Sequence, residues 1–471
     1  MVKKVCAGIA ALGLAAALIT AGCEHDSSPE EKPDYKLPPV YGEDLLDLTQ
    51  EYALKYFTDY AHPDCGMARE RKDNGRDLDL VTTGGTGFGV MAMLAGTERG
   101  FIDREEAAAR IAKIVNFLGE IDTYHGAYAH WYYGNTGETV TRGWDDGADL
   151  VETAFLFQGL LTAYEYFKNG TDQAEQDLCD SIQTLWKAIE WTWFQNNRVD
   201  TLFWHWSPNP EKYPDLDDNG FRVDFPLRGW NESLIVYVLA ASSPTHGIAK
   251  EVYAGWGGSS ILTNNTYYDI ELPMESTLGF ARKAKGGPLF FTHYSFLGLD
   301  PRGLKDENID YWKQVTAQAK INHLYCIDNP FGWKGYSSVD WGLTASNARV
   351  PNTPVQYNAS YPSFPDRDGD RGVIAPTAAL SSFPYTPNES MGALENFYNN
   401  LGGILWGEHG FFDAYRPDGT WYDTGYLAID QGPIVVMIEN YRSGLLWGLF
   451  MGNEDVQNGL SKLGFTSNPD N

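Results

Sequence analysis

The stretch Arg142–Leu161, RGWDDGADLVETAFLFQGLL, passes from a short polar loop into an apolar segment. It carries four carboxylates within eight residues, Asp145, Asp146, Asp149 and Glu152. Like charges this close repel one another, so a chain that keeps them has cationic partners for them or uses them. In a helix, Asp145 and Asp149 would share one face, with Glu152 close by. Asp145 or Asp146 could instead cap the helix, and Glu152 could lie in its first turn, where the helix dipole favours an acid.

The segment that follows Asp149 is apolar on all sides of a helix, as are the segments around Ile235 and Ile434. A helix of this kind is buried. About a dozen helical patterns of roughly 12–20 residues alternate with short turns and long aromatic loops. We expect Tyr336–Asn347 to run from a loop into a helix and Gln431–Met451 to form one long helix. An α-solenoid would need a sequence repeat, which is not visible. The pattern therefore favours an all-α closed toroid of paired helices, with a pocket formed by the loops at one end.

The N-terminus is typical of a bacterial signal peptide. Lys3 and Lys4 precede the apolar run Val5–Ile19, and the small residues Ala21-Gly22 precede Cys23, as in a lipobox. The run is too short for a confident membrane-spanning helix. The polar, acidic and Pro-containing segment that follows is typical of a flexible tether. We therefore expect a signal peptide at 1–22, a lipidated tether at 23–40 with Cys23 as the lipid site, and a single catalytic domain at 41–471. Simple secretion is the alternative to a lipid anchor in the cell envelope.

The charge balance limits the class of ligand. The net charge is −28, and removing Lys3 and Lys4 with the signal peptide would make it −30. Nucleic acid is therefore an unsuitable partner, because phosphate binding needs a basic surface, and an acidic polymer would be repelled. Aromatic residues make up 14% of the chain, with 15 Trp and 28 Tyr. Besides forming a large core, such rings can stack on the faces of sugars, so a neutral, hydroxyl-rich ligand fits best.

Cysteine and acidic loops give little support for a cofactor. Cys65, Cys179 and Cys326 remain after the predicted processing and allow at most one disulfide. No Cys/His pair has the spacing of zinc ligands. The loop Asp366–Asp370 resembles a calcium loop but lacks the later Glu of an EF-hand, so a polar turn is its simpler interpretation. We expect no metal or other cofactor.

A second acid stands at the start of another buried helix. Arg228-Gly229-Trp230-Asn231-Glu232 has the same form as Arg142-Gly143-Trp144-Asp145, with a carboxylate close to a Trp. A carboxyl beside an apolar ring in a partly dry cleft has a raised pKa, as a general acid needs. One protonated and one ionised carboxyl are the minimum for glycoside hydrolysis. A charge in the first turn of the helix is the structural alternative for Glu232.

The chain resembles a known family at several places in one order along the sequence. These are TGGTGFGVMAMLAGTERGFI (83–102), RGWDDGADLVETAFLFQGLL (142–161), GWNES (229–233) and GVIAPTAALSSFPYTP (372–387). Together with the lipoprotein signal they look like the bacterial glucoamylase-like family, over most of residues 41–460. The resemblance implies an (α/α)6 toroid and action on β-1,2-glucan with inversion at the anomeric carbon. It also implies catalytic acids in the motifs that hold Asp145, Asp149 and Glu232.

We assign Glu232 as the general acid and Asp145 or Asp149 as the base or as a group that holds a sugar hydroxyl. Further residues in or beside the aromatic loops are candidates for sugar contacts, with core packing or salt bridges as their alternative roles. They are Arg142, Trp144, His205, Trp206, Arg228, Trp230, Trp341, Tyr361, Tyr426 and Gln431.

The expected function is hydrolysis of β-1,2-glucan by a monomeric, lipid-anchored protein, with release of sophorose from chain ends slightly favoured over internal cleavage. Two alternatives stay open. One is a glucosidase of another linkage on the same fold. The other is a glycan-binding surface lipoprotein without catalysis, which would need aromatic platforms but no pair of acids.

Overall fold

A computed structural model describes residues 37–73, 77–143, 145–276, 284–349, 355–363 and 369–467. Lys36–Asn471 form one compact unit. The predicted signal peptide, Cys23 and most of the predicted tether lie outside the described residues. No helix in the described part of the chain is both long and apolar enough to cross a membrane.

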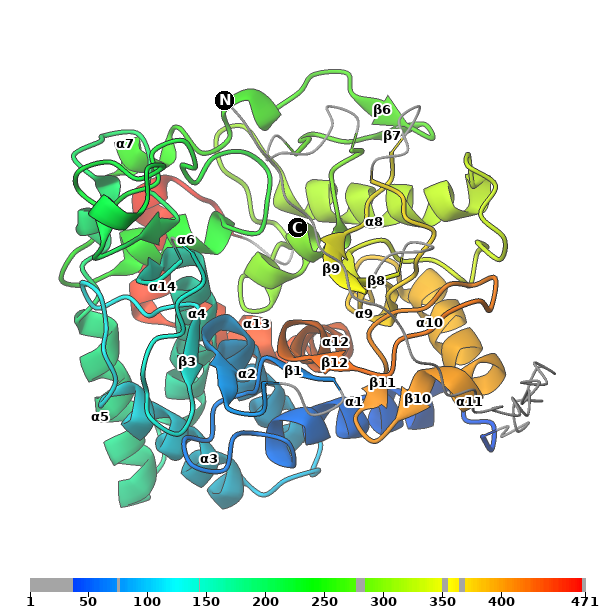
Figure 1. The fold of residues 1–471 in the computed structure, drawn as a ribbon, viewed down its shortest axis with the longest axis horizontal. Helices are drawn as coiled ribbons and strands as arrows, with labels where there is room; N and C mark the ends of the chain where they lie inside the picture. The colour runs from blue at the N-terminus through cyan, green and yellow to red at the C-terminus, as the bar shows by residue number, and fades with distance from the viewer. Residues whose placement is uncertain are drawn as a thin grey trace, which may run out of the picture. The chain divides into compact units, whose positions relative to one another are not determined.

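Helices dominate the structure (Figure 1). The α-helices are α1 (Gly42–Thr58), α2 (Thr83–Glu98), α3 (Arg104–Leu118), α4 (Leu150–Phe167), α5 (Gln173–Lys187), α6 (Leu234–Ser242), α7 (Lys250–Tyr253), α8 (Tyr311–Asp328), α9 (Pro376–Leu380), α10 (Pro387–Glu395), α11 (Gly402–Leu405), α12 (Ala428–Arg442), α13 (Leu445–Met451) and α14 (Glu454–Leu463). Short 3-10 turns are η1 (Trp191–Gln195), η2 (Pro210–Lys212), η3 (Gly258–Ser260), η4 (Leu289–Thr292) and η5 (Tyr294–Phe296), and η6 (Asn396–Asn400) is a π-turn.

Inner and outer helices differ in how much of their surface they bury. All nine residues of α6 are buried, as are 14 of 16 in α2, 15 of 18 in α4 and 12 of 15 in α12. In contrast, α5 buries five of 15 residues and α14 four of 10, along one stripe each. Helices that are buried all round form the inside of a ring, and amphipathic helices cover it. In Figure 1, α1, α3 and α5 lie outside α2 and α12. The fold is the all-α (α/α)6 toroid that the sequence predicts.

Two glycines let α2 and α4 pack with their backbones in contact. A Cβ on Gly87 would lie 2.2 Å from the carbonyl oxygen of Phe155, and one on Gly159 would lie 2.2 Å from that of Gly87. These distances are far below a van der Waals contact, so any side chain there would push the helices apart. The glycines of the 83–102 segment thus serve close helix packing, as the sequence analysis expects.

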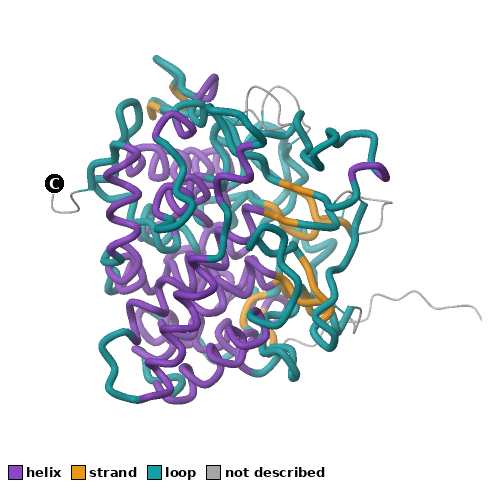
Figure 2. The backbone as a smooth tube through the Cα atoms, turned by 90° about the vertical axis from the view of Figure 1, so that its left-hand side faces the viewer, coloured by secondary structure: helices purple, strands orange, loops and turns teal. Residues whose placement is uncertain are grey.

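Short strands gather at one end of the helices. Figure 2 shows most of the helices on one side of the molecule and most of the strands on the other. Six antiparallel pairs form: β1 (Arg71–Lys72) with β12 (Tyr426–Leu427), β2 (Leu80–Thr82) with β3 (Trp131–Tyr133), β4 (Ala148–Asp149) with β5 (His205–Trp206), β6 (Thr266–Tyr267) with β7 (Ile270–Glu271), β8 (Ala345–Ala348) with β9 (Gln356–Ala359), and β10 (Trp406–Gly407) with β11 (Gly410–Phe411). β2, β4 and β12 lead directly into α2, α4 and α12, so this end fixes where those helices begin.

Two expectations about helices are wrong. Gln431–Met451 is not one helix, because α12 ends at Arg442 and α13 starts at Leu445 after Gly444, whose φ of 71° lies in the left-handed region that a helix cannot contain. The segment Tyr336–Asn347 does not run into a helix. Its end forms β8, which pairs with β9, so strand pairing overrides a weak local preference.

Candidate active site

A pocket of about 570 Å³ opens where α2, α4 and α12 begin. Its walls combine carboxylates, imidazoles, two arginines and aromatic rings. The lining residues are Glu70, Arg71, Thr82, His130, Trp131, Arg142, Asp145, Asp149, Val151, Glu152, Phe155, Trp204, His205, Phe225, Glu232, Phe290, Tyr294, Ala345, Tyr357, Leu427 and Ile429. The pocket therefore brings Asp145, Asp149 and Glu152 of the 142–161 stretch together with Glu232 in space.

His130 is the cationic centre of the acid cluster. Its Nδ1 lies 3.3 Å from Asp145 Oδ2 and 3.5 Å from Asp149 Oδ2, and its Nε2 lies 3.6 Å from Glu152 Oε1. His205 Nδ1 adds two contacts of 3.6 Å, to Asp145 Oδ1 and Asp149 Oδ2. Two imidazoles thus lie among three carboxylates, which explains how the chain tolerates the repulsion seen in the sequence.

The environment separates the protonation states of these groups. Burial opposes a charge on His130, but the three carboxylates outweigh burial and raise the pKa of its imidazole to about 10. Burial alone would raise the pKa of Asp145, yet hydrogen bonds and charges from the two imidazoles hold it well below the ordinary range. Burial raises the pKa of Asp149 and brings that of Glu152 to about 7. Asp145 is therefore held in its ionised form by the two imidazoles.

Three of the four acids also have structural roles. Asp149 is the N-cap of α4, because its Oδ1 accepts hydrogen bonds from the backbone N–H groups of Val151 and Glu152 at 2.9 and 3.0 Å. Glu152 Oε2 accepts the N–H of Gly84 at 2.7 Å and so joins α4 to α2. Asp146 lies outside the pocket, where Ser207, Asn209 and Tyr213 donate hydrogen bonds to it. Its role is to hold the 207–213 loop.

Glu232 also lines the pocket and lies just before α6. The hydroxyl of Ser295 donates a hydrogen bond to its backbone carbonyl, which fixes this part of the loop. Burial, followed by the charges of Asp149 and Glu152, raises the pKa of its carboxyl to about 8. A carboxyl that holds its proton at neutral pH can act as a general acid. The pocket thus holds one carboxyl that keeps its proton, Glu232, and one that is held ionised, Asp145.

A stacked group of rings and charges forms the wall beside the acids. The His130 ring stacks on Trp131, and the Arg142 guanidinium lies 4.6 Å from the centre of the Trp131 ring. The Trp131 indole N–H donates to Glu70 at 3.1 Å. Arg71 and Arg142 also line a neighbouring polar cavity of about 450 Å³, as does Tyr357, so the two cavities share a wall. The site thus consists of a cavity with aromatic walls and a polar cavity next to it, and a ligand that spans both would contact both kinds of group.

A second pair of acids lies beneath this wall and was missed by the sequence analysis. Asp413 and Asp430 are both almost fully buried. Burial and the charge of Asp423 raise the pKa of Asp413 to about 7, and burial with the charge of Asp413 raises that of Asp430 further. A hydrogen bond between the two carboxyls contributes to both shifts, so the pair holds one proton at neutral pH.

The predicted sugar-contacting residues fall into two groups. Arg142 and His205 line the pocket, and Trp144 lies outside the described residues. The others do not line it: Trp206, Arg228, Trp230, Trp341, Tyr361, Tyr426 and Gln431. Most of these are core residues, since Trp230 and Trp341 are fully buried and Gln431 donates to the carbonyl of Phe411. Arg228 forms an ion pair with Asp200 instead. Trp230, Trp341, Gln431 and Arg228 thus have packing, hydrogen-bond or ion-pair roles in the structure. Sugar contacts by Trp206, Tyr361 and Tyr426 outside this pocket stay a prediction.

The sequence analysis also missed His130, Glu70 and Trp131. His130 and Trp131 lie in the aromatic segment directly before the acid stretch, which was the one available signal. His130, Asp145 and Asp149 have ligand atoms within 4.8 Å of one another and, in the described part of the chain, form the group that could hold a metal ion. The ion pairs already balance these charges, and the raised pKa of His130 opposes the neutral form that binds metals. Of the loop Asp366–Asp370, expected to be a polar turn, only Gly369 and Asp370 are described, and two tyrosine hydroxyls donate to the Asp370 carboxylate.

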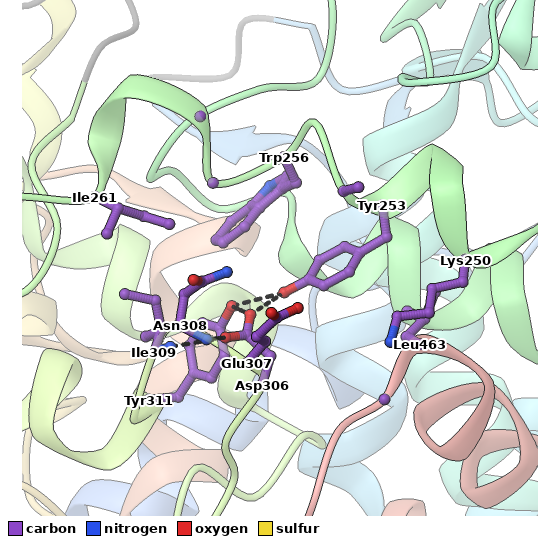
Figure 3. Close-up of a pocket in the computed structure, with 14 residues that line it drawn as sticks. Lys250, Tyr253, Trp256, Ile261, Asp306, Glu307, Asn308, Ile309, Tyr311 and Leu463 are labelled. Carbon is purple, nitrogen blue, oxygen red and sulfur yellow. Dashed lines mark hydrogen bonds between the residues drawn. The ribbon is translucent and has the colours of Figure 1, made fainter.

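A separate cavity of about 240 Å³ does not have the features of a sugar site (Figure 3). Its carboxylate Asp306 already accepts hydrogen bonds from the hydroxyls of Tyr253 and Tyr311. Trp256 forms part of the wall but is only 1% exposed, so it offers no open ring face. The three buried cysteines Cys65, Cys179 and Cys326 are all free thiols.

Comparisons with known proteins identify the family. The glycoamylase family model, described as "Putative glucoamylase", matches residues 224–454, and a model for a family of unknown function, DUF3131, matches residues 49–170. A curated relative from Parabacteroides distasonis, the exo beta-1,2-glucooligosaccharide sophorohydrolase (non-reducing end), is 44% identical over 447 residues, which cover 90% of this chain and 58% of the relative. The chain thus spans somewhat more than half the length of that protein.

Two solved structures are similar over nearly their whole length. A "putative glucoamylase" from Bacteroides uniformis is 48% identical, with a TM-score of 0.84 over 92% of this chain and 100% of the other. An endo-beta-1,2-glucanase from Chitinophaga pinensis, solved with sophorotriose and glucose, is 47% identical, with a TM-score of 0.83 over 91% and 99% of the two chains. The chain therefore belongs to the glycoamylase family.

Proposed function

We propose that this protein is a glycoside hydrolase that cleaves β-1,2-glucan with Glu232 as general acid and Asp145 as base. The observation that carries the proposal is the opposite protonation state of the two acids in one pocket. Glu232 would donate its proton to the glycosidic oxygen, and Asp145 would accept a proton from the attacking water. The linkage rests on the relatives, since the named activities of the Parabacteroides and Chitinophaga proteins are both toward β-1,2-linked glucan.

Asp145 suits the role of base better than Asp149. Both contact the two imidazoles, but Asp149 is occupied as the cap of α4 and accepts the indole N–H of Trp204 as well. Three hydrogen bonds occupy the Asp149 carboxylate, so fewer of its lone pairs are open to a water in the pocket. Asp149 would then hold the geometry of the cluster or bind a sugar hydroxyl.

We also propose that hydrolysis inverts the anomeric carbon and releases sophorose from a chain end. Inversion needs two carboxyls about 6.5–9.5 Å apart with room for a water between base and sugar. Glu232 and Asp145 line one pocket from different parts of the chain, which supports this proposal. The exo mode is the weaker part, because the relatives include a named exo and a named endo enzyme. The long loop between β5 and α6, which follows the pocket residue His205, would close one end of the cleft.

One experiment tests activity, linkage and mode together. Purified protein is incubated with linear β-1,2-glucan and, separately, with β-1,3-, β-1,4- and α-1,4-linked glucans, and products are resolved by size over time. We expect new reducing ends with the β-1,2-linked polymer alone, and sophorose as the only early product. An early ladder of longer products would replace exo by endo cleavage. Retained binding without any new reducing end would support the non-catalytic alternative. Proton NMR of the first anomer formed distinguishes inversion from retention.

Attachment to the cell envelope through lipid on Cys23 remains part of the proposal on sequence grounds alone, with the polar segment after it as the tether. Labelling of the expressed protein with a radioactive fatty acid would test it. A Cys23→Ser variant that still carries the label would contradict it.

A further inference from the structure

A cluster of aromatic rings lies on the other side of β5 from the pocket. The His125 ring stacks on Trp193, with centroids 3.8 Å apart and an interplanar angle of 14°. Trp206 packs edge-on against both, at 5.1 Å from His125 and 6.4 Å from Trp193. Tyr124 lies 6.1 Å from Trp206. We name these four residues, Tyr124, His125, Trp193 and Trp206, the aromatic platform.

The platform is built by unusual backbone geometry. His125 has a φ of 54°, in the left-handed region that few residues with a side chain adopt. Next to it, a Cβ on Gly126 would lie 2.1 Å from the carbonyl oxygen of Ala188, so the turn presses directly on the chain before η1. The His125 Nδ1 pairs with Glu190 at 2.8 Å, and its carbonyl accepts the N–H of Glu190. Strain of this kind persists where the surrounding structure holds it, and here it sets the His125 ring against Trp193.

The platform keeps a large apolar ring in water. Trp193 is 42% exposed. Leaving a ring of this size in water forgoes the stabilisation that its burial in the core would give. The neighbouring Glu190 carboxylate is about as exposed, at 44% of its side chain, and can accept hydroxyl hydrogens. His125 covers one face of the Trp193 ring, and the exposed remainder lies beside a hydrogen-bond acceptor. Such a pair of groups suits a pyranose, whose C–H face is apolar and whose edge carries hydroxyls. The net charge of −28 disfavours an anionic polymer at the same place.

The platform is continuous with the candidate active site through β5. His205 lines the pocket, and Trp206, the next residue of the strand, therefore points to the opposite face. In the register of β4 with β5, His205 lies opposite Asp149 and Trp206 opposite Ala148. We infer that the aromatic platform binds a part of the glucan chain that lies outside the pocket, with one sugar ring stacked on Trp193. The linkage of that glucan rests on the proposed function, whereas the stacking itself does not.

Binding to polymer tests this inference in the full chain. Glu232→Gln protein, which would not digest the probe, is run in native gels that contain linear β-1,2-glucan, with and without Trp193→Ala. Tyr441→Ala is the matched control, because Tyr441 is 41% exposed and lies near the C-terminal end of α12, away from the pocket. We expect Trp193→Ala to lower the apparent affinity for the glucan, as read from the retardation, by roughly 2- to 12-fold, which corresponds to the loss of one stacking contact. Tyr441→Ala should migrate like its parent.

A second readout separates stacking from a general structural effect. In the otherwise unaltered protein, Trp193→Ala should raise KM for long glucan relative to KM for short β-1,2-glucooligosaccharides by a similar factor. His125→Phe, which keeps a stacked ring, should restore part of the affinity relative to His125→Ala. Equal retardation of the Trp193→Ala and Tyr441→Ala proteins would overturn the inference, as would an unchanged ratio of the two KM values.

The same gels with β-1,3- and α-1,4-linked glucans keep this test apart from that of the proposed function. If the protein cleaves no β-1,2-glucan but one of these neutral glucans retards it in a Trp193-dependent way, the platform stands and the proposed substrate falls. If β-1,2-glucan is cleaved but no gel shows dependence on Trp193, the platform falls and the proposed substrate stands.

Discussion

The Glu232→Gln substitution tests the mechanism most directly, because the variant keeps the shape of the side chain and removes its acid proton. With a pKa of about 8, the carboxyl is about 90% protonated at pH 7. At the ordinary value of 4.5 the protonated fraction would be smaller by roughly 300-fold. General acid catalysis contributes about 10²–10⁴-fold to rate, so we expect kcat/KM on β-1,2-glucan to fall by this factor. The barrier would rise by about 3–5 kcal/mol.

The pH profile and the leaving group make this prediction specific. Because Glu232 acts in its protonated form, kcat/KM of the unaltered protein should be level below pH 8 and fall above it. Asp145 should add no acid limb in the usual assay range, since its pKa is lowered. Glu232→Gln should lose the basic limb together with most of the activity. A β-sophoroside with a dinitrophenyl leaving group needs no proton on departure, so its hydrolysis should be much less affected.

The matched control is Glu275→Gln. Glu275 is also a buried glutamate whose pKa burial raises, but it does not line the pocket. Its replacement should leave the pH profile unchanged. Near-full activity of Glu232→Gln on β-1,2-glucan would refute the assignment of the general acid. An intact basic limb in the residual activity of Glu232→Gln would refute the link between that limb and this carboxyl.

Three further predictions concern the scaffold and the buried charges, and each is checked by urea unfolding. His130→Gln removes the cation that three carboxylates share, so stability should drop by about 3–5 kcal/mol at pH 8 and by less at pH 5, where the acids can take up protons; an equal loss at both pH values would contradict this reason. Gly87→Ala places a methyl group 2.2 Å from the carbonyl oxygen of Phe155, and we expect a loss of about 1–3 kcal/mol, with Gly448→Ala, where a Cβ meets no atom within 4 Å, as the control. The raised pKa values of Asp413 and Asp430 mean that the native pair holds a proton that the unfolded chain releases, so stability falls as pH rises from about 4 to about 7. Asp430→Asn should flatten this fall, and an unchanged slope would show that the pair does not titrate as described.

The inner helices could be predicted from sequence because they need no knowledge of their partners. A segment such as the one around Phe155 or Ile235 is apolar on every side, and only a buried position accommodates it. The break between α12 and α13 falls at the largely polar residues 439–444, a signal that the expectation of one long helix overlooked. It depends on the left-handed conformation of Gly444. Likewise β8 forms through pairing with β9, and the local sequence ASNA expresses no preference for that pairing.

The acids of the candidate site could be predicted from the sequence, but the histidine and the aromatic residues around them could not. Acids cluster in the sequence because one loop and one helix start carry them, whereas His130 reaches them only through the fold. Aromatic residues were the least informative class. Trp230 and Trp341 lie in the core, while the exposed ring belongs to Trp193. Composition counts rings of both kinds alike, and only burial distinguishes a ring that packs from a ring that can bind.

The protonation states of Asp145 and Glu232 could not be predicted from the two motifs that contain them. Arg142-Gly143-Trp144-Asp145 and Arg228-Gly229-Trp230-Asn231-Glu232 look alike in sequence. In the structure, Arg142 stacks on Trp131 at the pocket wall, whereas Arg228 is drawn away to Asp200. Two imidazoles contact the Asp145 carboxylate and keep it ionised. Glu232 keeps its proton, because burial and the negative charges of Asp149 and Glu152 raise its pKa. Similar local sequences thus give opposite chemical roles, because the neighbours that decide each pKa come from other parts of the chain.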